Sequence, residues 1–85
     1  MTGPEIAQRA KDCLAQLTGH QPDTVSSMAR DDEGWHVNVE MVELKRIPAG
    51  SDLLATYEAV LDDEGNLIRY QRAGRYHRGQ VMEAA

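Results

Sequence analysis

The side chains best suited to chemistry lie near the C-terminal end of the chain, where arginine recurs at every third position with tyrosines between. The set comprises Arg69, Tyr70, Arg72, Arg75, Tyr76 and Arg78. A guanidinium is planar and donates two parallel N–H groups to a carboxylate or phosphate, and tyrosine is a rigid anchor at interfaces. We interpret these six residues as a candidate partner-binding surface. The alternative is a solvated edge strand whose charges prevent pairing with other chains.

The rest of the sequence holds no recognisable catalytic or cofactor motif. No CxxC, HExxH, GxGxxG, phosphate-loop or GxSxG pattern occurs. The histidines His20, His36 and His77 lie far apart, without the spacing of metal ligands. We interpret the neighbouring carboxylates Glu40 and Glu43 as solvating a strand face rather than sharing a proton. We therefore expect no enzyme activity, no metal site and no cofactor.

Length, composition and charge are those of one small domain. The 85 residues include 5% aromatic residues and no Phe, so we expect a thin, mainly aliphatic core. The net charge is −5, but residues 1–65 hold 5 basic and 13 acidic side chains, whereas residues 66–85 hold 4 basic and 1 acidic. The overall acidity argues against general nucleic-acid binding, while the local positive charge suits one anionic partner.

Cysteine content and hydropathy indicate the compartment. The single cysteine, Cys13, excludes an intramolecular disulfide, and we expect a buried thiol on the apolar side of a helix. The sequence contains no run of about 18 or more apolar residues, and its first ten residues lack the features of a secretory signal. We therefore expect a cytoplasmic protein that does not bind membranes.

The chain predicts an α+β fold in which an N-terminal helix packs on a three-stranded antiparallel β-meander, within a single domain of residues 1–85. We expect a helix over residues 4–18, a connector over 19–33, the sheet over 34–78 and a frayed tail over 79–85. In the polar connector, Val25 and Met28 form either a short extra strand or a plug at the sheet edge.

The predicted helix has clear start and stop signals. Pro4 suits the first turn, where its missing N–H would have no partner, and Gly19 suits the left-handed residue that ends a helix. Apolar residues recur at helical spacing and form one stripe. The stripe consists of Ile6, Ala10, Cys13, Leu14 and Leu17. We expect this stripe to pack on the sheet.

The first two predicted strands follow from alternating apolar residues. In the first, which starts at Trp35, the apolar parity changes at Val42, and this predicts a bulge near residues 40–42. Trp35 itself is expected in the core rather than at a contact surface. Residues 62–65, Asp-Asp-Glu-Gly, predict the hairpin turn between the second and third strands.

The third predicted strand carries the arginines and should lie at an edge of the sheet. A four-residue hairpin loop would place Tyr57 opposite Tyr70 and Ala59 opposite Ile68. Strict alternation would then separate the arginines, with Arg69 and Arg75 on one face and Arg72 and Arg78 on the other, unless a bulge near Gly74 reunites some of them.

The stretch from Gly34 to Gly79 resembles the gas vesicle protein O family, whose members are accessory proteins of gas vesicle synthesis. The residues that carry the resemblance are Gly34-Trp35, Val39-Glu40, Val42-Glu43-Leu44, Arg46-Ile47-Pro48, Asp52, Leu54-Ala55, Tyr57-Glu58, Leu61-Asp62, Gly65, Tyr70, Arg72 and Arg75-Tyr76. The resemblance implies a non-enzymatic role in forming a buoyant, gas-filled protein shell, together with other gas vesicle proteins and in association with the vesicle. It implies no catalytic or cofactor-binding residues.

Two other functions are compatible with the residues. The first is a small regulatory module that binds an anionic partner such as nucleic acid through the C-terminal arginines, with an affinity that falls steeply with salt. The second is a small β-meander binding or inhibitor module resembling the PepSY type, which the segment YEAVLDDEGNLIRY suggests. Modules of that type usually act outside the cytoplasm, and the absent secretory signal argues against this function.

Overall fold

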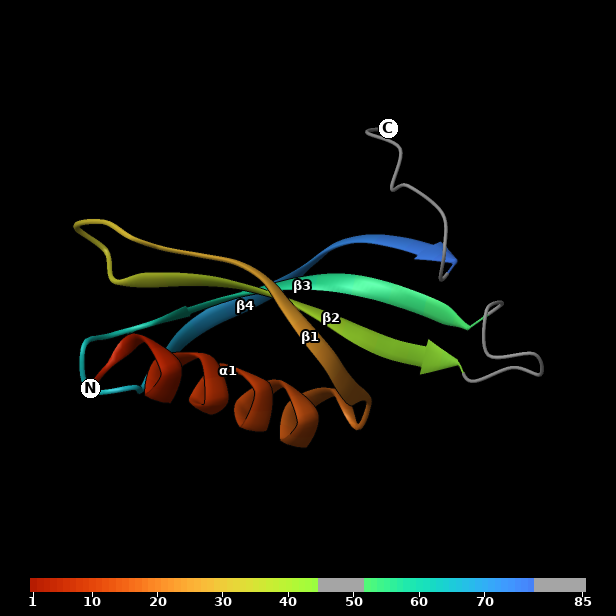
Figure 1. Ribbon diagram of the computed structural model, residues 1–85, viewed down its shortest axis with the longest axis horizontal. Coiled ribbons are helices and arrows are strands. Elements are labelled where there is room, and N and C mark those ends of the chain that lie inside the picture. The colour runs from red at the N-terminus through yellow and green to blue at the C-terminus, as the bar shows by residue number, and fades with distance from the viewer. Residues whose placement is uncertain (45–51, 78–85) are drawn as a thin grey trace.

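The computed structural model describes residues 1–44 and 52–77, and its elements form one helix and one antiparallel sheet (Figure 1). The elements are α1 (Gly3–Thr18), β1 (Gln21–Arg30), β2 (Trp35–Leu44), β3 (Leu53–Leu61) and β4 (Leu67–His77). Within the described residues the strands lie in the order β1-β2-β3-β4, so each strand pairs with the next in the chain. The α+β class is confirmed, but the sheet has four strands rather than three.

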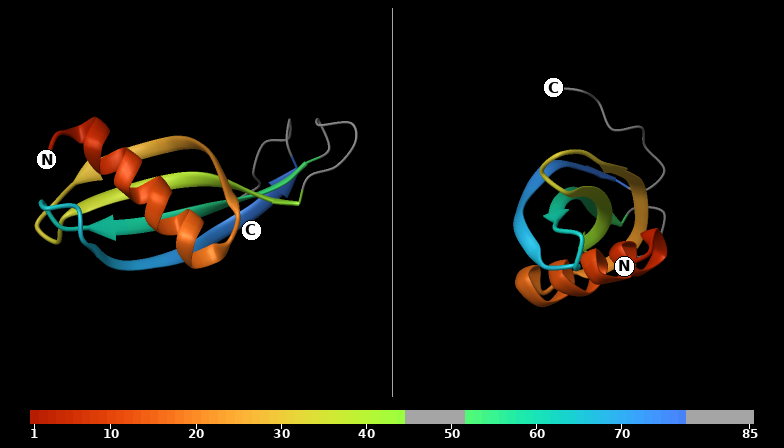
Figure 2. Two further views of the ribbon diagram at one scale, coloured as in Figure 1. Left: turned by 90° about the horizontal axis from the view of Figure 1, so that it is seen from below. Right: turned by 90° about the vertical axis from the view of Figure 1, so that its left-hand side faces the viewer.

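The helix begins and ends as predicted. The Thr2 hydroxyl accepts a hydrogen bond from the Glu5 amide, and the Glu5 carboxylate accepts one from the Thr2 amide, so two N-terminal donors are satisfied. Gly19 ends the helix with a φ of 74°. The side chains of Ile6 and Leu14 are fully buried, and α1 packs on β1, β2 and β3 along one face of the twisted sheet (Figure 2).

Two members of the predicted stripe do not pack as expected. Leu17 is 53% exposed, and Cys13 is a half-buried free thiol rather than a buried one. The line of closest contact runs through Ile6, Ala10 and Leu14, which are four residues apart, so Cys13 lies at the flank of this line. The apolar pattern identified the correct side of the helix but overestimated its buried width.

The predicted connector is in fact largely the edge strand β1. Of its ten residues, Pro22 and Val25 are half-buried and the other eight are exposed, so its apolar signal is weak. Its pairing with β2 also shifts register at Asp23 and at Ser26, and this breaks the two-residue period. The strand is therefore specified by pairing with β2 more than by its own residues.

The register of the sheet differs from the prediction in two places. The bulge in β2 lies at Glu43, not over residues 40–42, and Val42 stays on the opposite face at 8% exposure. In the β3–β4 hairpin, Leu61 pairs with Leu67 and a further shift follows, so Ala59 faces Tyr70 rather than Ile68. Ile68 and Tyr70 are 49% and 41% exposed, so burial does not set this register.

The hairpin turn itself forms where the sequence predicts it. The Asp62 carboxylate accepts hydrogen bonds from the Glu64 and Asn66 amides, and Gly65 has a φ of 84°. Because the register shifts after this turn, Tyr57 faces Arg72 across the ladder rather than Tyr70 as predicted.

The sheet has two faces of different character. The face under α1 forms the core, and Trp35 packs against it as a half-buried residue, as predicted. The core residues are Ile6, Ala10, Leu14, Val37, Val39, Met41, Ala55, Tyr57, Ala59 and Leu61. The opposite face, here called the open face, has buried apolar residues as well, but also the buried polar residues Glu40 and Thr56.

Candidate functional site

The predicted surface lies on β4, which is an edge strand of the sheet within the described residues, as expected. Its arginines do not follow strict alternation, because Ala73 is left out of the β3–β4 pairing next to Gly74. Arg72 and Arg75 consequently reach the same carboxylate, which confirms the bulge as the device that reunites them. Arg78 and the predicted tail lie outside the described residues.

The shared carboxylate is Glu43, whose side chain is 7% exposed. It accepts hydrogen bonds from Arg72 Nη1 and Arg75 Nε, each at 3.1 Å, and from the Tyr57 hydroxyl at 2.9 Å. His20 Nε2 lies 3.9 Å away. Because Tyr57 belongs to the core beneath α1, this Glu43 cluster lies on the helix-covered face.

The partners of Glu43 set its ionisation. Burial alone would raise the pKa of Glu43, but the hydrogen bonds from Tyr57 and Arg72, with the positive charge of Arg72, outweigh burial and lower it from 4.5. Burial and then the bond to Glu43 raise the pKa of Tyr57 above 10.0. The cluster therefore holds one carboxylate ionised between two guanidinium groups.

A second buried carboxylate, Glu40, lies three residues earlier in β2 and is 7% exposed. Its three donors are hydroxyl groups, one from each of the other strands. Glu40 Oε1 accepts from Thr56 Oγ1 and from the Tyr76 hydroxyl, both at 2.6 Å, and Oε2 accepts from Ser26 Oγ at 2.5 Å. No cation lies within 4 Å of this carboxylate among residues 1–44 and 52–77. The hydroxyls thus hold Glu40 on the open face without balancing its charge.

These two carboxylates correct the sequence analysis. Glu40 and Glu43 were expected to solvate one strand face, yet both are buried, and they lie on opposite faces of the sheet. One signal in the sequence could have indicated their burial. Both lie in the mainly apolar run from Trp35 to Leu44, where a fully exposed strand face would not be expected. Their hydrogen-bond donors come from up to 36 residues away and have no local signature.

Arg69 and Tyr70 lie apart from both carboxylates. Arg69 forms two hydrogen bonds to Glu33, at 2.7 and 3.1 Å, near the β1–β2 turn. Asp31, Glu33 and His36 together could hold a metal ion, since one ligand atom from each lies within 4.8 Å of the others. However, Arg69 already binds both oxygens of Glu33, and both acidic residues are exposed. We assign no metal to this group.

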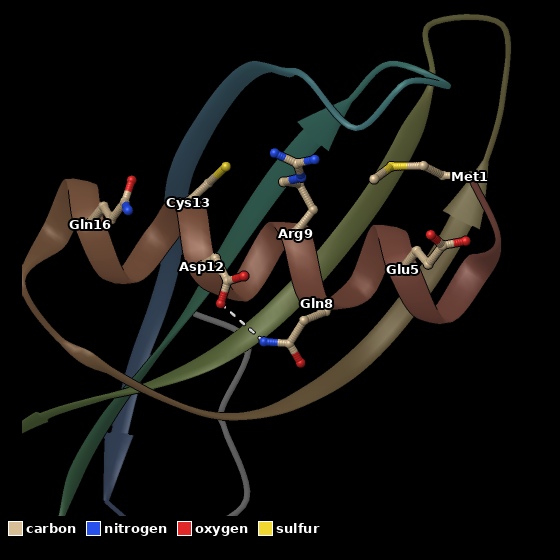
Figure 3. Close-up of a pocket in the computed structure, with 7 residues that line it drawn as sticks. All are labelled: Met1, Glu5, Gln8, Arg9, Asp12, Cys13 and Gln16. Carbon is tan, nitrogen blue, oxygen red and sulfur yellow. Dashed lines mark hydrogen bonds between the residues drawn. The ribbon is translucent and has the colours of Figure 1, made fainter.

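An open pocket of about 430 Å³ runs along α1 and includes Met1 and Cys13 (Figure 3). All its other lining residues are polar and come from α1, where Gln8 donates a hydrogen bond to Asp12 at 3.0 Å. This arrangement is an ordinary solvated helix surface. With its 16 residues, α1 is also too short and too polar to cross a membrane, and no other helix occurs in the described parts of the chain.

Comparison with known proteins identifies the family. The family described as "Gas vesicle synthesis protein GvpO" matches residues 1–82. A gas vesicle protein O from a Streptomyces strain is 49% identical over 67 residues, which cover 79% of this chain and 52% of that protein. Gas vesicle protein O1 of Halobacterium salinarum is 35% identical over 75 residues, which cover 88% of this chain and 63% of the relative.

A third relative extends the comparison. Gas vesicle protein O of Haloferax mediterranei is 30% identical over 76 residues, covering 88% of this chain and 54% of that protein. The chain thus spans between about half and two thirds of the length of these relatives. No solved structure matches the chain. The match over residues 1–82 and the named relatives show that this chain belongs to the GvpO family of gas vesicle synthesis proteins.

Proposed function

We propose that the chain acts in gas vesicle synthesis as a non-enzymatic accessory protein that works in the cytoplasm by binding other gas vesicle proteins. The observation that carries this proposal is the family match over residues 1–82, together with three relatives named gas vesicle protein O or O1. The partner is either the shell protein or an assembly factor.

The geometry supports β4 as the contact surface. An edge strand presents backbone N–H and C=O groups that a partner strand can pair with. Tyr70, Arg72 and Arg75 line this edge with 41–51% of their surface or side chain exposed. We propose the same six residues that the sequence singled out as the surface: Arg69, Tyr70, Arg72, Arg75, Tyr76 and Arg78.

The Glu43 cluster supports an acidic partner at this surface. Two guanidinium groups share a single carboxylate, so one positive charge remains in excess. Among the described residues, Arg72 bonds through Nη1 and Arg75 through Nε, which leaves further N–H groups of both side chains at the surface. Glu43 thereby orients both arginines before a partner arrives, and less side-chain entropy is lost on binding.

The same pairing argues against the nucleic-acid alternative. Arg69 binds Glu33, and Arg30 binds Asp63 through two hydrogen bonds, so much of the basic charge is already neutralised. With a net charge of −5, the chain would repel a polyphosphate backbone at long range. A protein with a local acidic group fits this surface better.

Complementation of a deletion strain tests both parts of the proposal. We expect the deletion to abolish normal gas vesicles and the wild-type gene to restore them, as counted by electron microscopy. The variant Arg72→Lys with Arg75→Lys keeps both charges but loses the planar fork, and we expect few vesicles from it. Arg30→Lys, which alters a surface pair away from β4, is the matched control and should restore wild-type numbers.

The outcomes test the role in gas vesicle synthesis and the β4 contact surface separately. Normal vesicles in the deletion strain would refute the role in synthesis. Wild-type numbers from the double lysine variant would refute the β4 surface alone and return its arginines to a solvated edge. The melting temperature of each purified variant must be within a few degrees of wild type, so that loss of vesicles reports contact rather than unfolding.

A further inference from the structure

The open face holds a buried negative charge that the described residues do not balance. Buried carboxylates in proteins are ordinarily paired with a cation or a metal, because hydrogen bonds from neutral groups only partly replace hydration. Glu43 follows this rule with two arginines, whereas Glu40 has the hydroxyls of Ser26, Thr56 and Tyr76. Of the two carboxylates, Glu40 therefore gains more from an added cation.

A hollow of about 550 Å³ gives access to this carboxylate. Two bulges shape it from opposite edges of the sheet. In β1 the bulge at Ser26 lets two successive serines, Ser26 and Ser27, line the same hollow, and in β4 the unpaired Ala73 lines it as well. In regular strands, successive side chains point to opposite faces. Bulges are frequent next to functional sites, where they re-aim side chains.

Further carboxylates lie outside the hollow, near His36. Glu58 of β3 and the turn residues Asp31 and Glu33 lie near His36 on the same face, within 3.7 Å of its ring nitrogens. With Glu40 these make four carboxylates, against which the described contacts place the single guanidinium of Arg69. Among residues 1–44 and 52–77, the charges in these contacts are therefore mainly negative, which favours a cation on this face.

We propose that this hollow binds a basic side chain of a protein partner, with arginine preferred over lysine. Among the described residues, Glu40 Oε2 accepts one hydrogen bond, from Ser26, which leaves a lone pair for an incoming N–H group. The Ala73 methyl offers apolar surface to a flat guanidinium. The hollow shares Tyr76 with the proposed β4 surface but not Arg72 and Arg75, which bind Glu43 on the helix-covered face. The inference does not depend on the role in gas vesicle synthesis.

The test uses the whole purified chain and N-acetyl-arginine amide as the probe, followed by amide chemical shifts in two-dimensional NMR. We expect saturable shifts at Ser26, Ser27, Asn38 and Ala73 with a dissociation constant in the millimolar range, about what one buried ion pair supports. N-acetyl-citrulline amide has nearly the same shape without the charge and should bind at least roughly tenfold more weakly, a difference of about 1.4 kcal/mol.

Two variants, Glu40→Gln and Ala73→Leu, change the site directly, and Glu58→Gln is the control. Glu40→Gln removes the charge inside the hollow and should weaken binding of the arginine probe about tenfold. Glu58→Gln removes a carboxylate of the same face outside the hollow, so it should weaken binding by less than about twofold. Ala73→Leu fills the hollow without touching the Glu40 hydrogen bonds and should abolish binding. This second variant decides the matter if Glu40→Gln fails to fold.

Several results would overturn the inference. They are the absence of saturable shifts at about 50 mM probe, equal binding of the citrulline and arginine probes, or unchanged affinity in Ala73→Leu. The oligomeric state of the free chain, measured by sedimentation, could also overturn the inference. If the chain dimerises and Glu40→Gln makes it monomeric while the probe does not bind, the basic side chain comes from a second copy and the proposed partner is wrong.

Discussion

Glu40 and Glu43 lie three residues apart in β2 and both side chains are largely buried, yet their hydrogen-bond partners differ between the two faces of the sheet. On the helix-covered face, Glu43 is held by two arginines and a tyrosine. On the open face, Glu40 is held by three hydroxyls. A hydroxyl can donate or accept, whereas a guanidinium only donates, so the first cluster demands an anion and the second tolerates a neutral group.

The two clusters represent two kinds of buried charge, one paired with cations and one held by neutral hydroxyl groups. The Glu43 cluster contains both signs and serves to fix Arg72 and Arg75 at the edge of the sheet. The Glu40 cluster contains one sign and links four strands, since its donors come from β1, β3 and β4. We therefore expect the charge of Glu43 to matter more for stability than the charge of Glu40.

The largest loss of stability should come from the core between α1 and the helix-covered face of the sheet, which has no counterpart on the open face. Leu14→Ala removes a fully buried side chain and leaves a cavity, and we expect a loss of about 2–5 kcal/mol in the free energy of unfolding. Leu17→Ala, at a position 53% exposed on the same helix, is the control and should cost less than about 1 kcal/mol. Thermal or urea unfolding measures both. Similar losses from the two would mean that α1 does not dock through Leu14.

A smaller effect should distinguish the two carboxylates themselves. Glu43→Gln leaves two guanidinium groups without their anion, and we expect a loss of roughly 1–3 kcal/mol. Glu40→Gln leaves hydroxyls that can rotate to accept from the new amide, so its loss should be about 1 kcal/mol or less. Urea unfolding of both variants under one buffer condition makes the comparison. A larger loss from Glu40→Gln would reverse the assignment of roles.

The smallest effect should be the pH dependence that Glu43 contributes. Because its pKa is lower in the folded than in the unfolded chain, the stabilisation is present above its ordinary value of 4.5 and is lost as pH falls through the lowered pKa. The difference in unfolding free energy between wild type and Glu43→Gln should therefore shrink as pH falls below 4.5. Urea unfolding at several pH values gives this difference. A difference that stays constant or grows would show that Glu43 is not held as an anion.

Local patterns in the sequence were enough for the helix and for the turn between β3 and β4. Pro4, an apolar stripe and a helix-ending Gly19 act within a few residues, so they can be recognised without the fold. The same holds for the hairpin turn at residues 62–65, where Asp62 bonds to nearby amides. The arginine spacing also identified β4 as unusual, although it could not say what the arginines bind.

Only the tertiary structure showed that β1 is a strand, which register the strands adopt and which partners the buried carboxylates have. β1 has few apolar residues and is held by its pairing with β2, an interaction that its own sequence does not display. Bulges at Ser26, Glu43 and Ala73 moved side chains between faces, and a shift of one residue reverses every assignment made by alternation. Whether Glu40 or Glu43 meets arginines depends on which strand residues arrive from about 30 positions away, and chain folding, not local spacing, brings those groups together.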